Sequence, residues 1–388
     1  MKRWKIRHDE DHVVIDLDLS NGADWVERVA DPSDWLLQAI SGLFNGPHES
    51  ITVSANVGGL SKGQPDSLSE AAAQAVRGIA GSAALEFAET RCRVNSVIWN
   101  SDSNSVDLQN AIKYLSNAQE AGFTTGATLR LDSPPIAVTG DILGGTVLVT
   151  GGAGGLGRAA AERLSAEGRN VVITDLRGEN LDKAAEEMGV VAIGANLGSQ
   201  ADLSQLANDP QLEDLTCLLI HHGVGASSRL NSQYDKVAGR RSIDINGTSV
   251  WATFSAFENL LKAKRSSTVV MLSSVAGLTA EPGNGAYGAA KFAVVGYVEG
   301  NVERLRSSGI RLHALCPGPI DTPLMRSIFA GFASDLGIST EQFTADRLGS
   351  IPLKMSGTPE HIGAAASFLA SSCATGLILA PTGGEVLT

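Results

Sequence analysis

The chain has 388 residues, of which 43% are hydrophobic and 19% are charged, and its formal net charge is −12 at pH 7. This length allows two domains, and the composition is typical of a folded globular protein. The acidic excess argues against nucleic acid as a partner, because phosphate binding needs concentrated Lys and Arg. The sequence shows no run of about 18 apolar residues and no signal peptide, so we expect no membrane span and a cytoplasmic location.

In the first third of the chain, apolar runs of strand type alternate with runs of helical spacing. Predicted strands cover 13–17, 51–55, 93–99 and 127–131, and predicted helices cover 35–43, 67–89 and 108–120. The tripeptide Ser133-Pro134-Pro135 breaks this pattern. We place the domain boundary near 133–143, which gives a first domain of 1–140 and a second of 141–388.

From Thr146 the alternation of strand and helix starts again and continues to the end of the chain. Such alternation predicts a parallel sheet with helices on both faces. The second domain has about seven strand candidates, whereas the first has only four, which match the last four of a full sheet. The predicted fold class is therefore α/β, with a doubly wound parallel sheet preceded by a smaller, truncated α/β domain.

A glycine-rich turn follows the first strand of the second domain. The strand 146–150 runs directly into Gly151-Gly152-Ala153-Gly154-Gly155-Leu156-Gly157 and then into an alanine-rich helix. Glycines let a backbone approach a pyrophosphate closely, and amides at the helix start meet its charge. In a glycine-rich chain the same pattern also suits an ordinary turn. The next strand favours a pyrophosphate site, because it ends at Asp175, where a carboxylate can bind ribose hydroxyls, although a solvated Asp at a strand end is the alternative.

Asp175 also bears on the choice of cofactor. A carboxylate at this place would repel a 2′-phosphate, so the sequence favours NAD(H) over NADP(H). Arg177, two residues later, leaves some room for use of both. We therefore predict a Rossmann-type dinucleotide site.

Several motifs together resemble the short-chain dehydrogenase/reductase family, from about residue 144 to 384. They are Thr150-Gly151-x-x-x-Gly155-x-Gly157, Asn246 in Asp244-Ile245-Asn246-Gly247, Ser274 placed 13 residues before Tyr287-x-x-x-Lys291, and Pro317-Gly318-Pro319-Ile320-Asp321-Thr322. The resemblance implies that Asn246, Ser274, Tyr287 and Lys291 are the catalytic residues. Each motif alone has an ordinary structural explanation, and Ser273 competes with Ser274.

The residue types suit hydride transfer at a carbon that carries oxygen, since that reaction also moves a proton. A free tyrosine has a pKa of about 10, which is too high for a base near neutrality. The ammonium of Lys291, one helical turn away, can lower the pKa of Tyr287. Ser274 would hold the substrate oxygen. The resemblance further implies that Lys291 holds the nicotinamide ribose and that Asn246 anchors a water beside it.

The predicted cofactor contacts are spread over the second domain. They are Gly151, Gly155, Leu156, Gly157, Asp175, Leu176, Asn196, Leu197, His221, Gly223, Tyr287, Lys291, Pro317, Gly318, Ile320 and Thr322. Three places depart from the family pattern. Ile220-His221-His222-Gly223 replaces an Asn-Asn-Ala-Gly turn, Asn196 replaces an Asp, and Thr382-Gly383-Gly384 replaces Asp-Gly-Gly.

We predict no metal site. Neighbouring side chains at a strand end point in opposite directions, so His221 and His222 do not converge on one ion. The four cysteines lie far apart, at 92, 217, 316 and 373, without zinc or redox spacing. They are expected to be buried thiols.

Residues 51–100 align with 269–318 at a constant offset of 218. Under this offset Asn56, Ser69 and Ala73 stand where the second domain has Ser274, Tyr287 and Lys291. The first domain is therefore predicted to be a degenerate, structural copy without a cofactor site. This two-part organisation resembles polyketide-synthase ketoreductases and high-molecular-weight ketoacyl reductases.

The resemblance implies an intramolecular pseudo-dimer of the two domains, with association into a homo-oligomer left open. In this family the long helices after the fourth and fifth strands commonly pack against those of a neighbour. We therefore expect helix 67–89 to pack against the helix that carries Tyr287.

The leading hypothesis for function is NAD(H)-dependent oxidation of a secondary alcohol, or the reverse reduction of a ketone. An apolar stripe after Thr322 favours a lid over a lipophilic or cyclic substrate, although simple helix packing would also explain it. The stripe consists of Leu324, Met325, Ile328, Phe329 and Phe332. A ketoreductase for 3-oxoacyl thioesters, using NAD(P)H, is the alternative. A non-catalytic, nucleotide-sensing protein is a third hypothesis.

Overall fold

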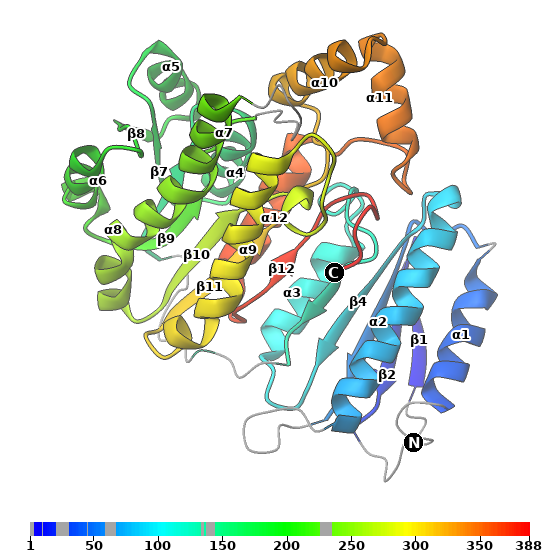
Figure 1. The fold of residues 1–388 in the computed structure, drawn as a ribbon. Helices are drawn as coiled ribbons and strands as arrows, with labels where there is room; N and C mark the ends of the chain where they lie inside the picture. The colour runs from blue at the N-terminus through cyan, green and yellow to red at the C-terminus, as the bar shows by residue number, and fades with distance from the viewer. Residues whose placement is uncertain are drawn as a thin grey trace.

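The computed structural model describes residues 4–9, 11–20, 31–44, 46–58, 67–132, 136, 144–225 and 235–388. It contains two sheets that lie beside each other, each with its own helices (Figure 1). This confirms the α/β class with a doubly wound sheet and a smaller preceding α/β domain. The predicted boundary at 133–143 lies, except for Ile136, outside the described residues.

The first sheet has the strand order β1-β2-β3-β4-β5. Its strands are β1 (Trp4–Asp9), β2 (His12–Asp18), β3 (Ser50–Asn56), β4 (Arg93–Trp99) and β5 (Thr128–Arg130). Strands β2 to β5 are parallel, as expected, while β1 pairs antiparallel with β2. The prediction of four strands was wrong by this one edge strand. Its sequence is mostly charged and exposed, so it lacks the apolar alternation that marks a strand.

Three helices cover the first sheet: α1 (Asp31–Leu43), α2 (Ser67–Phe87) and α3 (Ser105–Ser116). Helices α1 and α2 pack on one face around Leu36, Val76 and Ile98. Helix α3 covers the other face and begins earlier than predicted. The reason is the cap at Asn104, whose side chain accepts hydrogen bonds from the backbone amides of Val106 and Asp107.

The second sheet is parallel and has the order β12-β11-β10-β9-β6-β7-β8. Its strands are β6 (Thr146–Thr150), β7 (Asn170–Asp175), β8 (Val191–Gly194), β9 (Leu215–Ile220), β10 (Ser267–Leu272), β11 (Ile310–Leu315) and β12 (Ile378–Leu379). The order reverses between β6 and β9, which is the point where doubly wound sheets bind their ligands.

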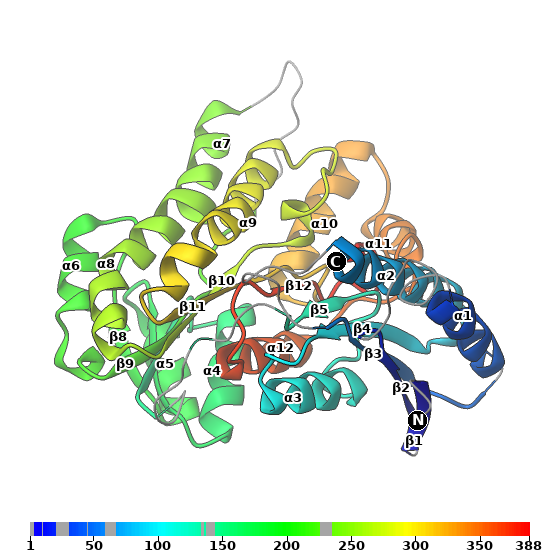
Figure 2. The same ribbon diagram turned by 90° about the horizontal axis from the view of Figure 1, so that it is seen from below.

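Helices lie on both faces of the second sheet (Figure 2). One face carries α4 (Gly155–Ala166), α5 (Glu179–Met188) and α12 (Pro359–Ser371); the other carries α6 (Gln200–Ala207), α8 (Ser249–Lys264) and α9 (Gly285–Arg306), with α7 (Lys236–Ile243) beside α9. Successive strand residues alternate between the two cores, as Val147 and Leu148 do. Among the described residues, no helix is long and apolar enough to cross a membrane.

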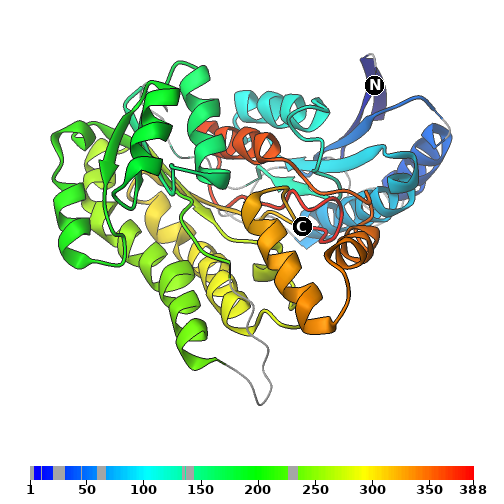
Figure 3. The ribbon, with the colours of Figure 1, turned by 90° about the horizontal axis from the view of Figure 1, so that it is seen from above.

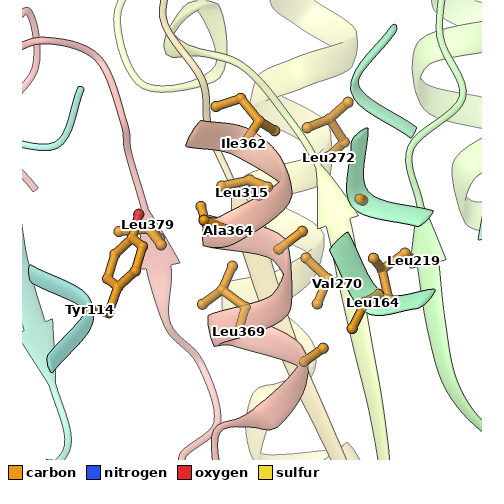
Figure 4. Close-up of a cluster of buried hydrophobic side chains, with 14 of the residues drawn as sticks. Tyr114, Leu164, Leu219, Val270, Leu272, Leu315, Ile362, Ala364, Leu369 and Leu379 are labelled. Atoms are coloured by element: carbon orange, nitrogen blue, oxygen red, sulfur yellow. The ribbon is translucent and has the colours of Figure 1, made fainter. Parts of the chain in front are cut away.

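The two domains share a hydrophobic core. The cluster beneath α4, α5 and α12 continues into Leu115, Phe123 and Leu129 of the first domain. The ring of Tyr114 stacks on that of Phe368, with 4.8 Å between centroids. Figure 4 shows Tyr114 beside Leu379 and helix α12. The domains are therefore joined by buried apolar side chains rather than by a linker alone.

The helices that pack across this contact are α3 and α12, and the backbone amide of Cys373 donates to the Asp107 carboxylate at 2.7 Å. The predicted packing of α2 against α9 is wrong for the described residues. Helix α2 already buries its apolar side on β3, β4 and α1.

The strand register is repeated in the two sheets. Ser50 pairs with Arg93 between β3 and β4, and Thr268 pairs with Arg311 between β10 and β11, which is the same pairing shifted by 218. Further along, Thr125 accepts a hydrogen bond from the amide of Val94, and Thr375 accepts one from that of Leu312, both at 3.0 Å. That second pair of threonines is shifted by 250, because α10 (Pro323–Leu336) and α11 (Thr340–Gly349) exist only in the second domain.

Candidate active site

The candidate residues converge at the carboxyl ends of β6, β7, β9, β10 and β11. These ends share one edge of the sheet because all five strands are parallel. Helices α10 and α11 stand at this edge, as Figure 3 shows from above. The sequence therefore supplied the residues, and the parallel sheet brings their side chains to one place.

The glycine turn after β6 has the shape that a pyrophosphate requires. Gly151 and Gly155 have positive φ angles of 69° and 54°. A Cβ on Gly157 would lie 2.2 Å from the carbonyl oxygen of Gly151, so only glycine permits this close approach. Gly154 caps α4, and no side chain of the described residues caps that helix end. The residues present thus fit a dinucleotide.

Asp175 ends β7 beside this turn. Its carboxylate accepts hydrogen bonds from the backbone amides of Ala153 at 3.2 Å and Leu176 at 2.8 Å. The Arg177 guanidinium pairs with Asp202 at 2.7 Å. The exposed Leu176 side chain lies next to the carboxylate in sequence. The turn and the acidic strand end are therefore held together by direct hydrogen bonds.

Asn196 and Leu197 follow β8. The side-chain oxygen of Asn196 accepts a hydrogen bond from the backbone amide of Gly198 at 3.0 Å. The backbone amide of Asn196 donates to the Asp202 carboxylate at 2.8 Å. Asn196 is exposed and Leu197 is buried. The oxygen predicted to meet an adenine amino group thus already holds a local turn, with one lone pair left.

The two histidines after β9 have different surroundings. His222 bonds to the hydroxyls of Thr150 and Ser249, each at 2.8 Å. His221 is buried, and its ring is hydrogen-bonded to the backbone of Leu156 in the glycine turn. Burial lowers the pKa of His221 to about 4 and that of His222 to about 3, so both rings are neutral at pH 7. No metal-binding group of His, Cys, Asp or Glu occurs in the described part of the chain.

Ser274, Tyr287 and Lys291 meet at the start of α9. Ser274 follows β10 and caps a short turn by accepting from the amide of Ala276 at 3.2 Å. Its hydroxyl is also hydrogen-bonded to Tyr287. Lys291 donates to the carbonyl of Leu272 at 3.0 Å, and its ammonium lies 5.6 Å from the centre of the Tyr287 ring. The three side chains are therefore neighbours.

Ser273 does not compete for the place of Ser274. It is buried and donates to the carbonyl oxygen of Lys291 at 2.8 Å. This bond holds helix α9 against β10. Ser273 therefore holds the backbone of Lys291 in position, while the hydroxyl of Ser274 is hydrogen-bonded to Tyr287.

The expected lowering of the Tyr287 pKa is not found in the chain by itself. Burial raises the pKa of Tyr287 above its ordinary value, and the hydrogen bond with Ser274 opposes that rise. Burial also lowers the pKa of Lys291 to about 8. The phenol is consequently protonated at pH 7, which is the form that can donate a proton.

Asn246 lies in a π-helical turn, Asp244–Thr248, between α7 and α8. Such turns shift the side chains that follow them and are frequent at functional sites. Its side chain accepts from the amide of Val224 and donates to the carbonyls of Val224 and Ser242, all at 3.0 Å. A Cβ on Gly223 would lie 2.7 Å from the Asn246 oxygen and 3.8 Å from the Lys291 ammonium. The side chains of Asn246 and Lys291 therefore both lie close to Gly223, where a larger residue would meet them.

The loop after β11 runs from Pro317 to Thr322. The carbonyl of Pro317 accepts from the amide of Val275 at 2.7 Å, which ties the loop to the residue after Ser274. Ile320 forms a bridge with Gly357. Thr322 caps α10 by accepting from the amide of Met325 at 3.1 Å, and its hydroxyl can still donate.

The apolar stripe lies on α10, where some of its side chains pack against α11 and some contact the segments beside the candidate site. Phe329 and Phe332 contact Phe343 of α11, with centroids 5.3 and 5.7 Å apart, which is helix packing. Ile328 touches Gly225 after β9, and Phe332 touches Gly283 before α9. Helix α10 therefore spans the two segments on either side of the candidate site.

Sequence reasoning missed a charged cluster at the site. Arg347 of α11 contacts Glu281 at 3.1 Å and Glu385 at 2.6 Å. Glu281 lies between Ser274 and Tyr287 in the sequence. No sequence signal marks this cluster, because its members come from three distant segments and each could be an ordinary surface charge.

The fold and this arrangement of side chains define a dinucleotide-binding oxidoreductase. A family profile described as "short chain dehydrogenase" matches residues 145–332. Oxidoreductase UcpA of Salmonella typhimurium is 30% identical over 241 residues, covering 60% of this chain and 89% of that protein. The chain belongs to the short-chain dehydrogenase family, whose members use a nicotinamide cofactor.

Two further proteins are similar to this chain. The 3-oxoacyl-acyl-carrier-protein reductase FabG of Chlamydia trachomatis is 26% identical and covers 64% of this chain and 99% of that protein. A crystal structure of an actinorhodin polyketide ketoreductase variant with NADPH has a TM-score of 0.59 at 21% identity, covering 64% of this chain and 99% of that one. This second likeness concerns the fold.

Proposed function

We propose that the protein transfers a hydride between a secondary alcohol or ketone and NAD(H), with Tyr287 as the acid and base. The observation that carries this proposal is the contact of Ser274, Tyr287 and Lys291 beside a glycine turn that fits a dinucleotide. The nucleotide-sensing hypothesis predicts a broken set of these side chains, and the set is complete.

A nicotinamide held by the loop 317–322 and Lys291 would supply the hydride for reduction of a carbonyl carbon. The Tyr287 phenol, whose pKa is raised by burial, donates its proton to the carbonyl oxygen. Ser274 donates a hydrogen bond to the same oxygen and fixes its distance from the phenol. In alcohol oxidation the phenolate of Tyr287 accepts the hydroxyl proton. The positive charge of Lys291, within 5.6 Å of the ring centre, favours that phenolate.

The preference for NAD(H) rests on Asp175 and Arg177. The Asp175 carboxylate stands at the glycine turn, where it can accept hydrogen bonds from ribose hydroxyls and would repel a 2′-phosphate. Arg177 is the cation nearest in sequence, and its charge is already paired with Asp202. The cofactor contacts assigned to Gly151, Gly155, Gly157 and the loop 317–322 belong to the same proposal.

A second candidate function is reduction of a 3-oxoacyl thioester. It is supported by FabG, which is named for that reaction, and by the two-part organisation of the chain. The apolar α10, whose Leu324 side chain is 51% exposed, suits an acyl chain as well as a cyclic ketone. A 3-oxoacyl thioester on a phosphopantetheine arm should then be turned over faster than its free ketone counterpart.

We further propose that the first domain acts as a built-in partner, so that the chain is a pseudo-dimer. Three contacts support this. Tyr114 stacks on Phe368, the residue at its own place in the aligned helix. Asp107, third in α3, binds the amide of Cys373, while His361, third in α12, lies against Gly122. Each domain thus offers the same surface to the other, as the subunits of a two-fold dimer do.

One experiment tests the proposed function. The purified protein is mixed with a panel of secondary alcohols, cyclic and linear ketones and a 3-oxoacyl thioester, each with NAD(H) and NADP(H), and reduced-nicotinamide absorbance is followed. We expect turnover of an apolar ketone or alcohol with NAD(H). Faster turnover of the thioester with NADPH would support the second candidate, and binding of NADH without any turnover would overturn both enzymatic proposals.

A further inference from the structure

An aromatic ring of the first domain lies directly behind the loop assigned to the nicotinamide. Phe123 is fully buried and follows α3. Its ring occupies the space left by three glycines of the second domain. A Cβ would come within 2.5 Å of the ring at both Gly357 and Gly383, and within 3.4 Å at Gly318. The ring of one domain therefore fits where the other domain has no side chains.

Two of these glycines belong to the loop 317–322 or are hydrogen-bonded to it. Gly318 is part of it. The amide of Gly357 donates to the carbonyl of Pro319, and the carbonyl of Gly357 accepts from the amide of Asp321, both at 2.9 Å. One end of the loop is tied to Val275, next to Ser274. The Phe123 ring supports the opposite side of the same loop.

The third glycine belongs to the C-terminal segment 380–388. Its amide donates to the carbonyl of Phe123 at 2.9 Å, and its carbonyl accepts from the amide of Leu353 at 3.1 Å. The amide of Thr128 donates to the carbonyl of Thr388 at 2.8 Å. Arg77 also donates to the carbonyl of Leu387 at 3.2 Å, so the first domain holds this segment at three points, and the segment holds Phe123 against the loop.

We propose that Phe123 is a positioning residue for the nicotinamide half of the cofactor site, acting through the loop 317–322. The inference rests on the proposed function, since it takes this site to bind a nicotinamide dinucleotide. The adenosine half is built on β6 and β7, which β9 and β10 separate from β11. Loss of the ring should therefore affect the two halves of the cofactor unequally.

The test compares the dissociation constants of NADH and of ADP-ribose, which lacks nicotinamide, in the full-length protein. Phe123→Ala should weaken NADH binding about 10- to 100-fold, while ADP-ribose binding changes by less than about twofold, because misplacement is confined to the loop. Phe123→Leu, which refills part of the space, should recover most of the NADH affinity. If Phe123→Ala does not fold, Phe123→Leu decides: it should still raise the ratio of the NADH to the ADP-ribose dissociation constant by about two- to fivefold, and an unchanged ratio would overturn the positioning role.

Phe368→Ala is the matched control, since it removes a Phe ring from the same domain contact but away from the loop. It should leave the ratio of the two dissociation constants unchanged. Equal weakening of both ligands by Phe123→Ala, or the same change of ratio in Phe368→Ala, would overturn the positioning role. A wild-type protein that binds neither ligand would overturn the proposed function itself, and that result is visible before any variant is measured.

Discussion

Each of the two sheets of this protein contains a pair of strands with the same register, but the side chains and segments attached to the two pairs differ. Strands β3 and β4 pair in the same register as β10 and β11, and Val57 bonds to the carbonyl of Trp99 as Val275 bonds to that of Pro317. In the second domain this frame carries Ser274, Tyr287 and Lys291. In the first, Asn56 and Ser69 bond to local backbone groups, and Ala73 is packed in the core. The comparison teaches that the backbone frame and the chemistry are separable.

A second difference lies beyond the shared strands. The second domain adds the glycine turn, β6 to β8 and the helices α10 and α11, whereas the described part of the first domain adds the edge strand β1. Both domains retain the surface formed by α3 or α12 with the adjoining strand. The retained surface is the one through which the domains share a core.

The largest expected effect tests whether the chemistry depends on the side chains that the second domain has and the first lacks. Tyr287→Phe removes the hydroxyl that exchanges the proton, so kcat should fall by roughly 10²- to 10⁴-fold. NADH binding should remain within about twofold, because the ring is kept. Steady-state kinetics and fluorescence titration measure the two quantities.

Ser69→Ala is the matched control for Tyr287→Phe, since Ser69 stands at the aligned place in the first domain. Its hydroxyl donates to the carbonyl of Val57 at 2.7 Å, which is a structural bond. Turnover should be unchanged in this variant. Full activity of Tyr287→Phe would remove Tyr287 from proton transfer.

The next effect concerns the shared core. Leu115 is fully buried in the cluster that joins the domains. Leu115→Ala should lower the free energy of unfolding by about 2–5 kcal/mol, through lost burial and the cavity that remains. Because the cluster belongs to both domains, calorimetry should show one transition that moves as a whole.

Leu85→Ala makes the same change at a site that is 47% exposed in the same domain, and it should shift the transition very little. Two separate calorimetric transitions, of which Leu115→Ala moves only one, would contradict a common core.

A smaller effect concerns the cofactor. Asp175→Ala removes the carboxylate at the glycine turn, and the ratio of kcat/KM for NADH over NADPH should fall on the order of 10- to 100-fold. The physical reason is relief of repulsion toward a 2′-phosphate together with loss of hydrogen bonds to the ribose. Asp202→Asn is a useful companion, since it frees Arg177 and leaves Asp175 in place. An unchanged ratio in Asp175→Ala would remove Asp175 from cofactor selection.

The last prediction concerns stability, and it places in the second domain the residue type that the first domain has at the aligned position. His313 accepts a hydrogen bond from the amide of Leu377, and at the aligned place Asn95 accepts one from that of Ala127. Burial lowers the pKa of His313 to about 3 from its ordinary 6.5. The stability contributed by the neutral ring is therefore complete above pH 6.5 and is lost as the pH falls toward 3, because only the unfolded chain takes up the proton.

His313→Asn should fold normally and lose about 2 kcal/mol less stability than the wild type between pH 7 and pH 5. Urea unfolding at the two pH values measures this difference. The other buried histidines titrate equally in both proteins and cancel. An identical loss in the two proteins would show that His313 is not the group that titrates.

The sequence by itself determined the features that depend on local order. The glycine turn, the strand that ends at Asp175 and the spacing of Ser274, Tyr287 and Lys291 are set by neighbouring residues, and the structure brings each to the expected edge of the sheet. The paired register of the two halves was likewise visible as a constant offset, since a strand carries its alternation with it.

Only the tertiary structure decided how the halves associate and how that association bears on the site. Several helices have apolar faces of similar composition, so sequence does not say that α3 meets α12 rather than α2 meeting α9. The contacts of Phe123, and of Arg347 with Glu281 and Glu385, join segments that are far apart in the chain. The direction in which the Tyr287 pKa shifts was also hidden, because burial is a property of the packed molecule and outweighs the hydrogen bond with Ser274.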